Sequence, residues 1–172
     1  AEGRRVEESG MQELDGKRYY LNRDFSLYRF TTGTNNCEGT IYVHAGEDGF
    51  AFSPAVEGYL ELDGALYAVQ ADGSVLQNAQ DGYLSFGADG KYTSGNETLD
   101  AGVQALLDTA CEKEALREEK LRQAYDYIRD NFKYLSMQHY DAGTTDWAEE
   151  AALTFLEQGK GNCYCFAGLF LY

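Results

Sequence analysis

The sequence has few basic residues and no long apolar run, and each shortage excludes a class of function. Fourteen lysines and arginines stand against 29 aspartates and glutamates, which gives a net charge of −15 over 172 residues. This balance argues against electrostatic binding of nucleic acid or of an anionic membrane surface. No apolar run approaches the roughly 18 residues that a membrane-spanning helix needs. We therefore expect no membrane insertion.

Cysteine is also scarce. The four cysteines, at positions 37, 111, 163 and 165, follow no metal-ligand spacing, because Cys163-x-Cys165 lacks a second pair. They do not form a disulfide framework for a chain of this length, although a single Cys37–Cys111 bridge stays open. We expect no metal site.

Tyrosine, phenylalanine and glycine, by contrast, are abundant. The chain contains 14 Tyr, 9 Phe and 19 Gly, and the Tyr and Gly concentrate before residue 100. With 44% hydrophobic residues the composition is that of a globular protein. Short strands joined by turns suit this mixture.

Four related segments begin with an acidic residue followed by glycine, at positions 15, 38, 63 and 81. Each continues with a strand that carries an aromatic residue, and then with Asp-Gly or a degenerate version of it. Asp-Gly between short alternating runs is a strong hairpin signal, because glycine adopts positive φ freely. The starts are 23, 25 and 18 residues apart. We predict one β-hairpin per repeat, with stacked hairpins and aromatic residues buried between neighbours.

These repeats resemble the cell-wall-binding repeats, of choline-binding or glucan-binding type, of Gram-positive surface proteins. The best copy consists of Gly58-Tyr59, Asp63-Gly64, Leu66-Tyr67 and Asp72-Gly73. The resemblance implies a partner such as a cell-wall glycan or a choline-bearing polymer. The choline-binding version cages a quaternary ammonium with Trp pairs and a Tyr, whereas these repeats contain no Trp.

Six aromatic residues are candidates for such a ligand site: Tyr19, Tyr20, Tyr42, Tyr59, Tyr67 and Phe86. The alternative is that aromatic residues of this kind form the stacking core between hairpins. The sequence leaves both interpretations open.

From about residue 100 the pattern becomes helical, because apolar residues recur at spacings of three and four. We predict three helices. The first covers about 100–112, the second runs from a break near 112–114 to about 131, and the third covers 147–158. For the third helix we expect Asp146 to be the N-cap and Gly159 to end it.

The last fourteen residues place a thiol at the start of a helix. Gly159, Gly161 and Asn162 predict a loop, and Cys163 opens an apolar run. Unpartnered N–H groups and the dipole at a helix N-terminus favour thiolate over thiol and stabilise a tetrahedral oxyanion. Gly168 is small enough to let this helix approach another element closely.

Residues 161–167 contain the pattern Gly-x-Cys-x-x-aromatic-Ala. Together with the segments 124–134 and 147–159, this pattern resembles the N-terminal half of bacterial transglutaminase-like domains, which are papain-like cysteine enzymes. The resemblance implies that Cys163 is the nucleophile, whereas we expect Cys165 to lie in the core. It also implies acyl transfer at peptide or glutamine amides through a thioester, with a peptidase favoured over a cross-linker. Such chemistry needs no metal or organic cofactor.

The catalytic His and Asp of that family lie downstream of the cysteine, and this sequence ends nine residues after Cys163. The histidines present are His44 and His139, and we expect neither to be the base. Because residues 169–172 are apolar without a cap, we expect the chain to be a fragment. As it stands, it should be catalytically incomplete.

We therefore expect an α+β protein with a β-hairpin repeat module at 1–98, a helical connector at 99–114 and a transglutaminase-like domain at 115–172, truncated after the nucleophile helix. The predicted function is that of a secreted or cell-wall-associated cysteine enzyme with a peptide or protein substrate. The polar start at Ala1 fits either a mature secreted protein or an artificially shortened chain, and the sequence leaves both open. The alternative is a non-enzymatic cell-wall binding or adhesion protein with an incomplete cysteine domain.

Overall fold

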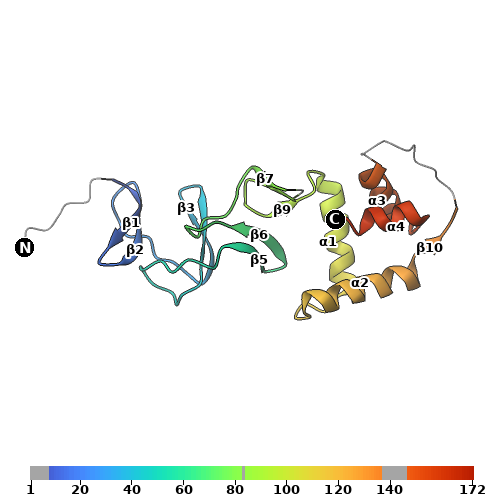
Figure 1. The fold of residues 1–172 in the computed structure, drawn as a ribbon, viewed down its shortest axis with the longest axis horizontal. Coiled ribbons are helices and arrows are strands. Elements are labelled where there is room, and N and C mark those ends of the chain that lie inside the picture. Colours follow the sequence, from blue (N-terminus) through green and yellow to red (C-terminus); the bar gives the residue numbers. More distant parts are fainter. Residues whose placement is uncertain (1–7, 83, 137–146) are drawn as a thin grey trace, which may run out of the picture. The chain divides into compact units, whose positions relative to one another are not determined.

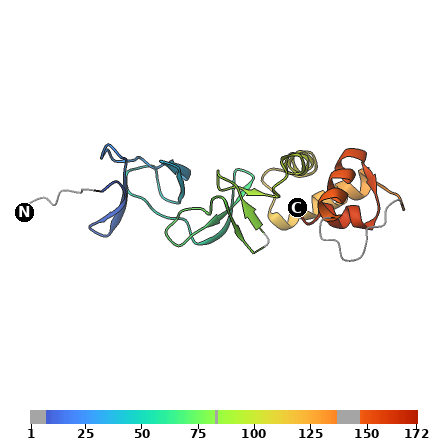
Figure 2. The same ribbon diagram turned by 90° about the horizontal axis from the view of Figure 1, so that it is seen from above.

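The computed structural model describes residues 8–82, 84–136 and 147–172. The chain divides into two compact units, one up to Tyr92 and one from Thr93 onward. Figure 1 shows the strands of the first unit in blue to green and the helices of the second in yellow to red, and Figure 2 shows the same ribbon from above. The predicted α+β class, with hairpins before helices, is confirmed.

The first unit is built from antiparallel hairpins. Three have strands of five residues: β1 (Gly10–Leu14) with β2 (Lys17–Leu21), β3 (Gly33–Cys37) with β4 (Thr40–His44), and β5 (Gly58–Leu62) with β6 (Ala65–Val69). A shorter hairpin pairs β7 (Ala79–Asp81) with β8 (Leu84–Phe86), and β9 (Tyr92–Thr93) joins the same sheet. One hairpin per repeat, as predicted, is confirmed.

The acidic-Gly pairs form the turns of the three long hairpins. At Asp15-Gly16, Glu38-Gly39 and Asp63-Gly64 both residues have positive φ, between 51° and 102°. This is the two-residue type I′ turn, whose twist matches that of the flanking strands. The second Asp-Gly of the later repeats, and Asp24-Phe25 of the first, lie instead in the loop that follows the hairpin.

After each hairpin a short return segment of the chain joins neighbouring repeats. The N–H of Val75 donates to the carbonyl of Ile41 on β4 at 2.8 Å, and Val75 also bridges Val69 on β6. The return segment 52–54 bridges β2 and β4 in the same way. Each return segment therefore acts as an extra strand between its own hairpin and the preceding one, which satisfies backbone groups that a lone hairpin would leave to water.

Aromatic side chains fill the space between the repeats, as predicted. Phe30 is fully buried, lies 4.8 Å from the Phe52 ring centroid and stacks on His44 at 5.5 Å. Tyr20 and Cys37 belong to the same apolar cluster. A second cluster contains Val43, Tyr67, Val69 and Val75.

The second unit contains α1 (Glu97–Ala110), α2 (Arg117–Asn131), α3 (Trp147–Gln158) and α4 (Cys163–Leu169), with a parallel pair of β10 (Lys133–Tyr134) and β11 (Lys160–Gly161). The predicted helices are confirmed. The first begins a turn earlier than expected, because Asn96 Oδ1 accepts the N–H groups of Thr98 and Leu99. Asp146, the expected N-cap of α3, lies outside the described residues.

The four helices share one apolar core. Its buried members are Leu99, Leu106, Ala124, Ile128, Ala151, Ala152, Phe155, Cys165 and Leu169. Two of them, Leu99 and Leu106, lie on α1, so most of the segment 99–114 packs with the later helices rather than standing apart as a connector. Leu121 and Tyr125, which follow the apolar pattern of α2, are 61% and 53% exposed.

A glycine allows α4 to approach α3. A Cβ atom on Gly168 would lie 2.7 Å from the carbonyl oxygen of Ala148 and 3.3 Å from Ala151 Cβ. The carbonyl belongs to the backbone and cannot swing aside. The expected close approach at position 168 is confirmed.

We predict that Gly168→Ala lowers the free energy of unfolding of the helical unit by about 1–3 kcal/mol, because the added methyl overpacks a rigid contact. Trp147, the only tryptophan of the chain, lies in this unit and reports its unfolding by fluorescence in urea.

Gly102→Ala on α1 is the matched control. There the nearest atom to the new Cβ, at 2.9 Å, is the flexible Leu156 Cδ1, and alanine favours the helix by about 1 kcal/mol. Its net effect should stay within about 1 kcal/mol of zero. Equal losses in both variants would contradict the steric explanation.

Candidate nucleophile site

The loop before Cys163 is fixed by the end of α3 and by its pairing with β10. Gly159 ends α3 with a φ of +61°, a left-handed conformation that favours glycine. The N–H of Lys133 then donates to the carbonyl of Gly159 at 2.9 Å, and that of Leu135 donates to Gly161 at 2.7 Å. The short parallel pair of β10 and β11 thus fixes where α4 begins.

Packing explains the glycine of the Gly-x-Cys pattern. A Cβ atom on Gly161 would lie 2.6 Å from Cys165 Cβ, 2.7 Å from its sulfur and 2.9 Å from a ring carbon of Phe155. Any side chain would therefore push the first turn of α4 off the core. The position of Cys163 depends on this contact.

Asn162 is the N-cap of α4. Its side chain is 6% exposed, and Oδ1 accepts the N–H groups of Tyr164 at 3.0 Å and Cys165 at 3.4 Å. From the sequence we expected the N–H groups at the start of this helix to have no partners. That expectation is wrong for Tyr164 and Cys165, whose N–H groups donate to Asn162. The sequence signal was present, because Asn directly before an apolar helical run is a preferred cap.

The two neighbouring cysteines differ in environment. Cys163 is exposed, whereas Cys165 is buried in the helical core, as predicted from its place in the pattern. Cys37 is buried as well, and burial raises the pKa of its thiol to about 12, with Glu38 adding to the effect. Burial also raises the pKa of Cys111. All four thiols are free, so the bridge between Cys37 and Cys111 that the sequence left open is wrong.

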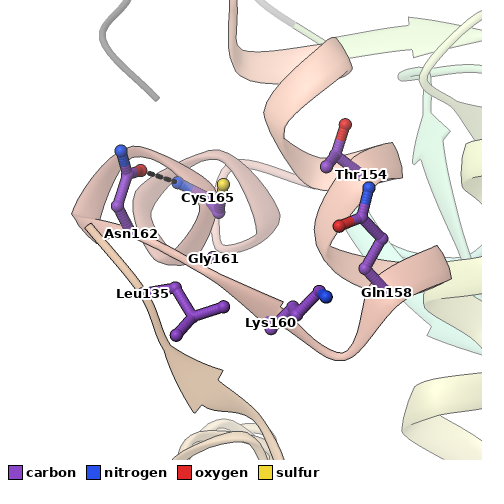
Figure 3. A pocket seen from close by; sticks show the side chains of 7 residues that line it. All are labelled: Leu135, Thr154, Gln158, Lys160, Gly161, Asn162 and Cys165. Atoms are coloured by element: carbon purple, nitrogen blue, oxygen red, sulfur yellow. Dashed lines mark hydrogen bonds between the residues drawn. The ribbon is translucent and has the colours of Figure 1, made fainter. Parts of the chain in front are cut away.

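A cavity of about 150 Å³ lies beside the first turn of α4. Figure 3 shows its lining, with the sulfur of Cys165 and the amide of Asn162 on one side and Gln158 and Lys160 on the other. Cys163 is not among the lining residues. The exposed thiol of Cys163 therefore lies on the open surface rather than in this cavity.

Aromatic rings hold the start of α4. Tyr164, next to Cys163 and 36% exposed, meets Trp147 edge to face at 5.3 Å. On the inner side Phe166 contacts Phe155 at 4.5 Å and stacks with Tyr134 at 6.2 Å. These contacts leave the first turn little freedom to rotate.

His44, the histidine among the described residues, has both ring nitrogens engaged within the repeat unit. His44 is 1% exposed, its Nδ1 accepts the N–H of Ser53 at 3.0 Å, and its Nε2 lies 2.9 Å from the carbonyl of Glu47. Because Nδ1 accepts, the hydrogen lies on Nε2, and both ring nitrogens serve the repeat. His139 lies outside the described residues.

The six candidate ligand aromatics have different environments. Tyr20, Tyr67 and Phe86 are buried, and Tyr19 and Tyr42 are half-buried. Tyr59 is 53% exposed; its ring stacks with Phe86 at 6.5 Å and 14°, and its hydroxyl donates to Asp81 Oδ2 at 2.7 Å. This hydrogen bond raises the pKa of Tyr59. A ligand role for any of the six stays a prediction.

The described residues hold neither a membrane span nor a metal-ligand cluster. None of their helices is both long and apolar enough to cross a bilayer. Over the same ranges, no three His, Cys, Asp or Glu side chains gather where they could hold a metal ion.

Residues 104–172 match the family model of the transglutaminase-like superfamily. The resemblance inferred from the pattern around Cys163 is thereby confirmed for this region, which is two fifths of the chain. No curated protein matches the sequence.

Solved structures resemble the repeat unit. Choline binding protein F from Streptococcus pneumoniae is 22% identical over 51% of this chain, with a TM-score of 0.33, and the chain spans 27% of its length. The choline-binding domain of CbpL from the same organism is 22% identical over 52% of this chain and 44% of its own, with a TM-score of 0.31. An alternansucrase in complex with isomaltotriose is 23% identical over 52% of this chain and 8% of its own, with a TM-score of 0.25. The likeness concerns the fold of the hairpins alone.

We predict that iodoacetamide at pH 7 alkylates Cys163 at least about tenfold faster than Cys37 or Cys165, because buried thiols react only after local opening. Peptide mapping by mass spectrometry measures the four rates separately. The same reaction in denaturant is the control and should label all four cysteines alike. Equal rates in the native chain would contradict this assignment of an exposed nucleophile.

Proposed function

We propose that the transglutaminase-like core at residues 104–172 uses Cys163 as the nucleophile of a cysteine enzyme acting on peptide or glutamine amides. The observation that carries the proposal is the exposed Cys163 thiol at the first position of α4, fixed there by Gly161 and Asn162. A surface thiol on a rigid turn is accessible to an extended peptide or to a glutamine side chain.

The reaction proceeds through a thioester. The thiolate of Cys163 attacks the amide carbonyl, a carbon–sulfur bond forms, and the carbon–nitrogen bond breaks after the amine takes up a proton. Water or a second amine then attacks the thioester and restores the thiol. The resemblance favours water over an amine as the second nucleophile, and hence a peptidase over a cross-linker.

The proton carriers of this reaction come from outside the described residues. Both ring nitrogens of His44 are hydrogen-bonded within the repeat unit. The described part of the helical unit contains no histidine. A general base and a general acid are still required, since a neutral thiol is a weak nucleophile and an amide anion is a poor leaving group. In transglutaminase-like enzymes a His and an Asp that follow the cysteine in sequence fill these roles.

We predict that Cys163→Ala in the full-length natural protein lowers amide hydrolysis by at least about 10³-fold, because the covalent route is lost. The assay follows ammonia or amine release from glutamine-containing peptides, and a fluorescent primary amine detects cross-linking in the same samples. Cys111→Ser, which removes a thiol elsewhere in the same unit, should retain activity. An active Cys163→Ala variant would overturn the proposal.

A second candidate function is binding of a cell-wall polymer by the repeat unit, at the bacterial surface. The observation that favours it is Tyr59, whose ring is half exposed yet held by Phe86 and Asp81. A fixed, exposed aromatic face binds the apolar face of a sugar or an organic cation without loss of side-chain entropy. If the cysteine domain is inactive, this binding is the whole function.

We predict that Tyr59→Ala weakens binding of wall glycan fragments or choline at least about tenfold, whereas Tyr59→Phe keeps the ring and most of the affinity. Isothermal titration with each ligand measures both. Phe50→Ala, which removes a ring that is 50% exposed, is the control. Unchanged affinity in Tyr59→Ala, or no heat with either ligand, would count against this function.

A further inference from the structure

Phe25, Gly73 and Gly90 occupy equivalent positions in three loops that follow hairpins. In each loop the N–H of this residue donates to the carbonyl three residues earlier, at 2.8 to 3.0 Å. In each, the preceding aspartate accepts the N–H of the following residue, at 2.9 to 3.1 Å. All three have φ between 65° and 87°. The three loops are copies of one turn, and only the first carries a side chain at this position.

At the two later copies the preceding repeat leaves no room for a side chain. A Cβ on Gly73 would lie 2.6 Å from Pro54 Cβ and 2.7 Å from Phe52 Cζ. A Cβ on Gly90 would collide with the side chain of Val75. Pro54 and Val75 both belong to the return segment of the repeat before. Where a repeat with this turn stacks on the repeat before, this position of the turn therefore requires glycine, whereas the loop after β4 is longer and forms a different turn.

Phe25 breaks this requirement at the first repeat. Its φ is +65° and its side chain is 53% exposed. A bulky residue in the left-handed region is strained, and such strain persists where the residue serves a purpose that glycine cannot. The strain is not offset by burial, because half of the ring faces solvent.

We propose that Phe25 is a steric cap, which prevents a further hairpin repeat from stacking on the first hairpin in the way that the later repeats stack on each other. A preceding return segment would meet Phe25 where Pro54 meets Gly73. This one residue blocks such stacking, while the rest of the turn keeps the geometry that stacking uses.

The surface next to Phe25 retains the features of a stacking surface. Leu27 bridges Leu21 as Val75 bridges Val69, so Leu27 and Val75 are equivalent. Val75 is 3% exposed and donates its N–H to Ile41 of the preceding hairpin, whereas Leu27 is 46% exposed. An apolar strand edge of this kind invites pairing with another hairpin, and a cap at Phe25 removes that hazard.

The test inserts a second copy of residues 33–57 between Ser9 and Gly10 of the full chain. Gly10, Gly33 and Gly58 all start a hairpin with positive φ, so the inserted copy runs into Gly10 as residue 57 runs into Gly58. The insertion is made with Phe25, with Phe25→Gly and with Phe25→Ala. Hydrogen exchange of the Leu27 amide is the readout, because stacking would give it the partner that Val75 has.

With Phe25→Gly the inserted repeat should slow exchange at Leu27 at least about tenfold relative to Phe25→Gly without the insertion. With Phe25, and with Phe25→Ala, whose Cβ alone makes the contact, the insertion should leave exchange at Leu27 unchanged. Equal protection with Phe25 and with glycine would overturn the proposal. So would the absence of protection in all three variants, since the edge would then be closed by something other than position 25.

Discussion

Both units depend on close contacts at glycines, where the neighbouring atoms leave no room for a side chain. In the hairpin array this contact lies at Gly73 and Gly90, where the preceding repeat fills the space of a side chain. In the helical unit it lies at Gly161 and Gly168, which seat α4 against α3. Because packed interiors transmit strain rather than absorb it, a methyl at any of these sites moves a whole element. The abundance of glycine in this chain thus has two causes, the positive φ of the turns and the close approach between elements.

The same constraint positions the chemistry. Gly161 lets the first turn of α4 press on Phe155, Asn162 caps that turn, and Cys163 follows on the solvent side. The cap takes up the first-turn N–H groups of Tyr164 and Cys165, so the helix start contributes rigidity more than free donors. The position of the Cys163 thiol is therefore fixed by its own unit. Activation of the thiol is a separate step, which needs groups from elsewhere.

Local signals in the sequence predicted most of the elements, and long-range packing accounts for what they missed. The acidic-Gly pairs predicted the hairpins because a type I′ turn is decided by two residues, and Gly159 predicted the end of α3 for the same reason. Cys163 was predicted as the nucleophile because its pattern lies within seven consecutive residues, and the repeat alignment already set Asp24-Phe25 against Asp72-Gly73. The return segments and the exposure of Leu121 depend on contacts between residues far apart in sequence. No periodicity reveals such contacts, since they depend on which repeat lies against which.

The exposed rings beside α4 and the exposed Cys163 thiol share one physical constraint. Tyr164 in the first turn of α4 and Phe170 at its C-cap are 36% and 39% exposed, and Phe170 contacts the half-exposed Tyr125 at 6.1 Å. A thiol that faces open water gains little from neighbouring dipoles, because water screens them. An element that packed on these rings would exclude water and strengthen every electrostatic interaction of the thiol, including that with an imidazole it carried. Exclusion of water at this surface and activation of the thiol are therefore one physical requirement.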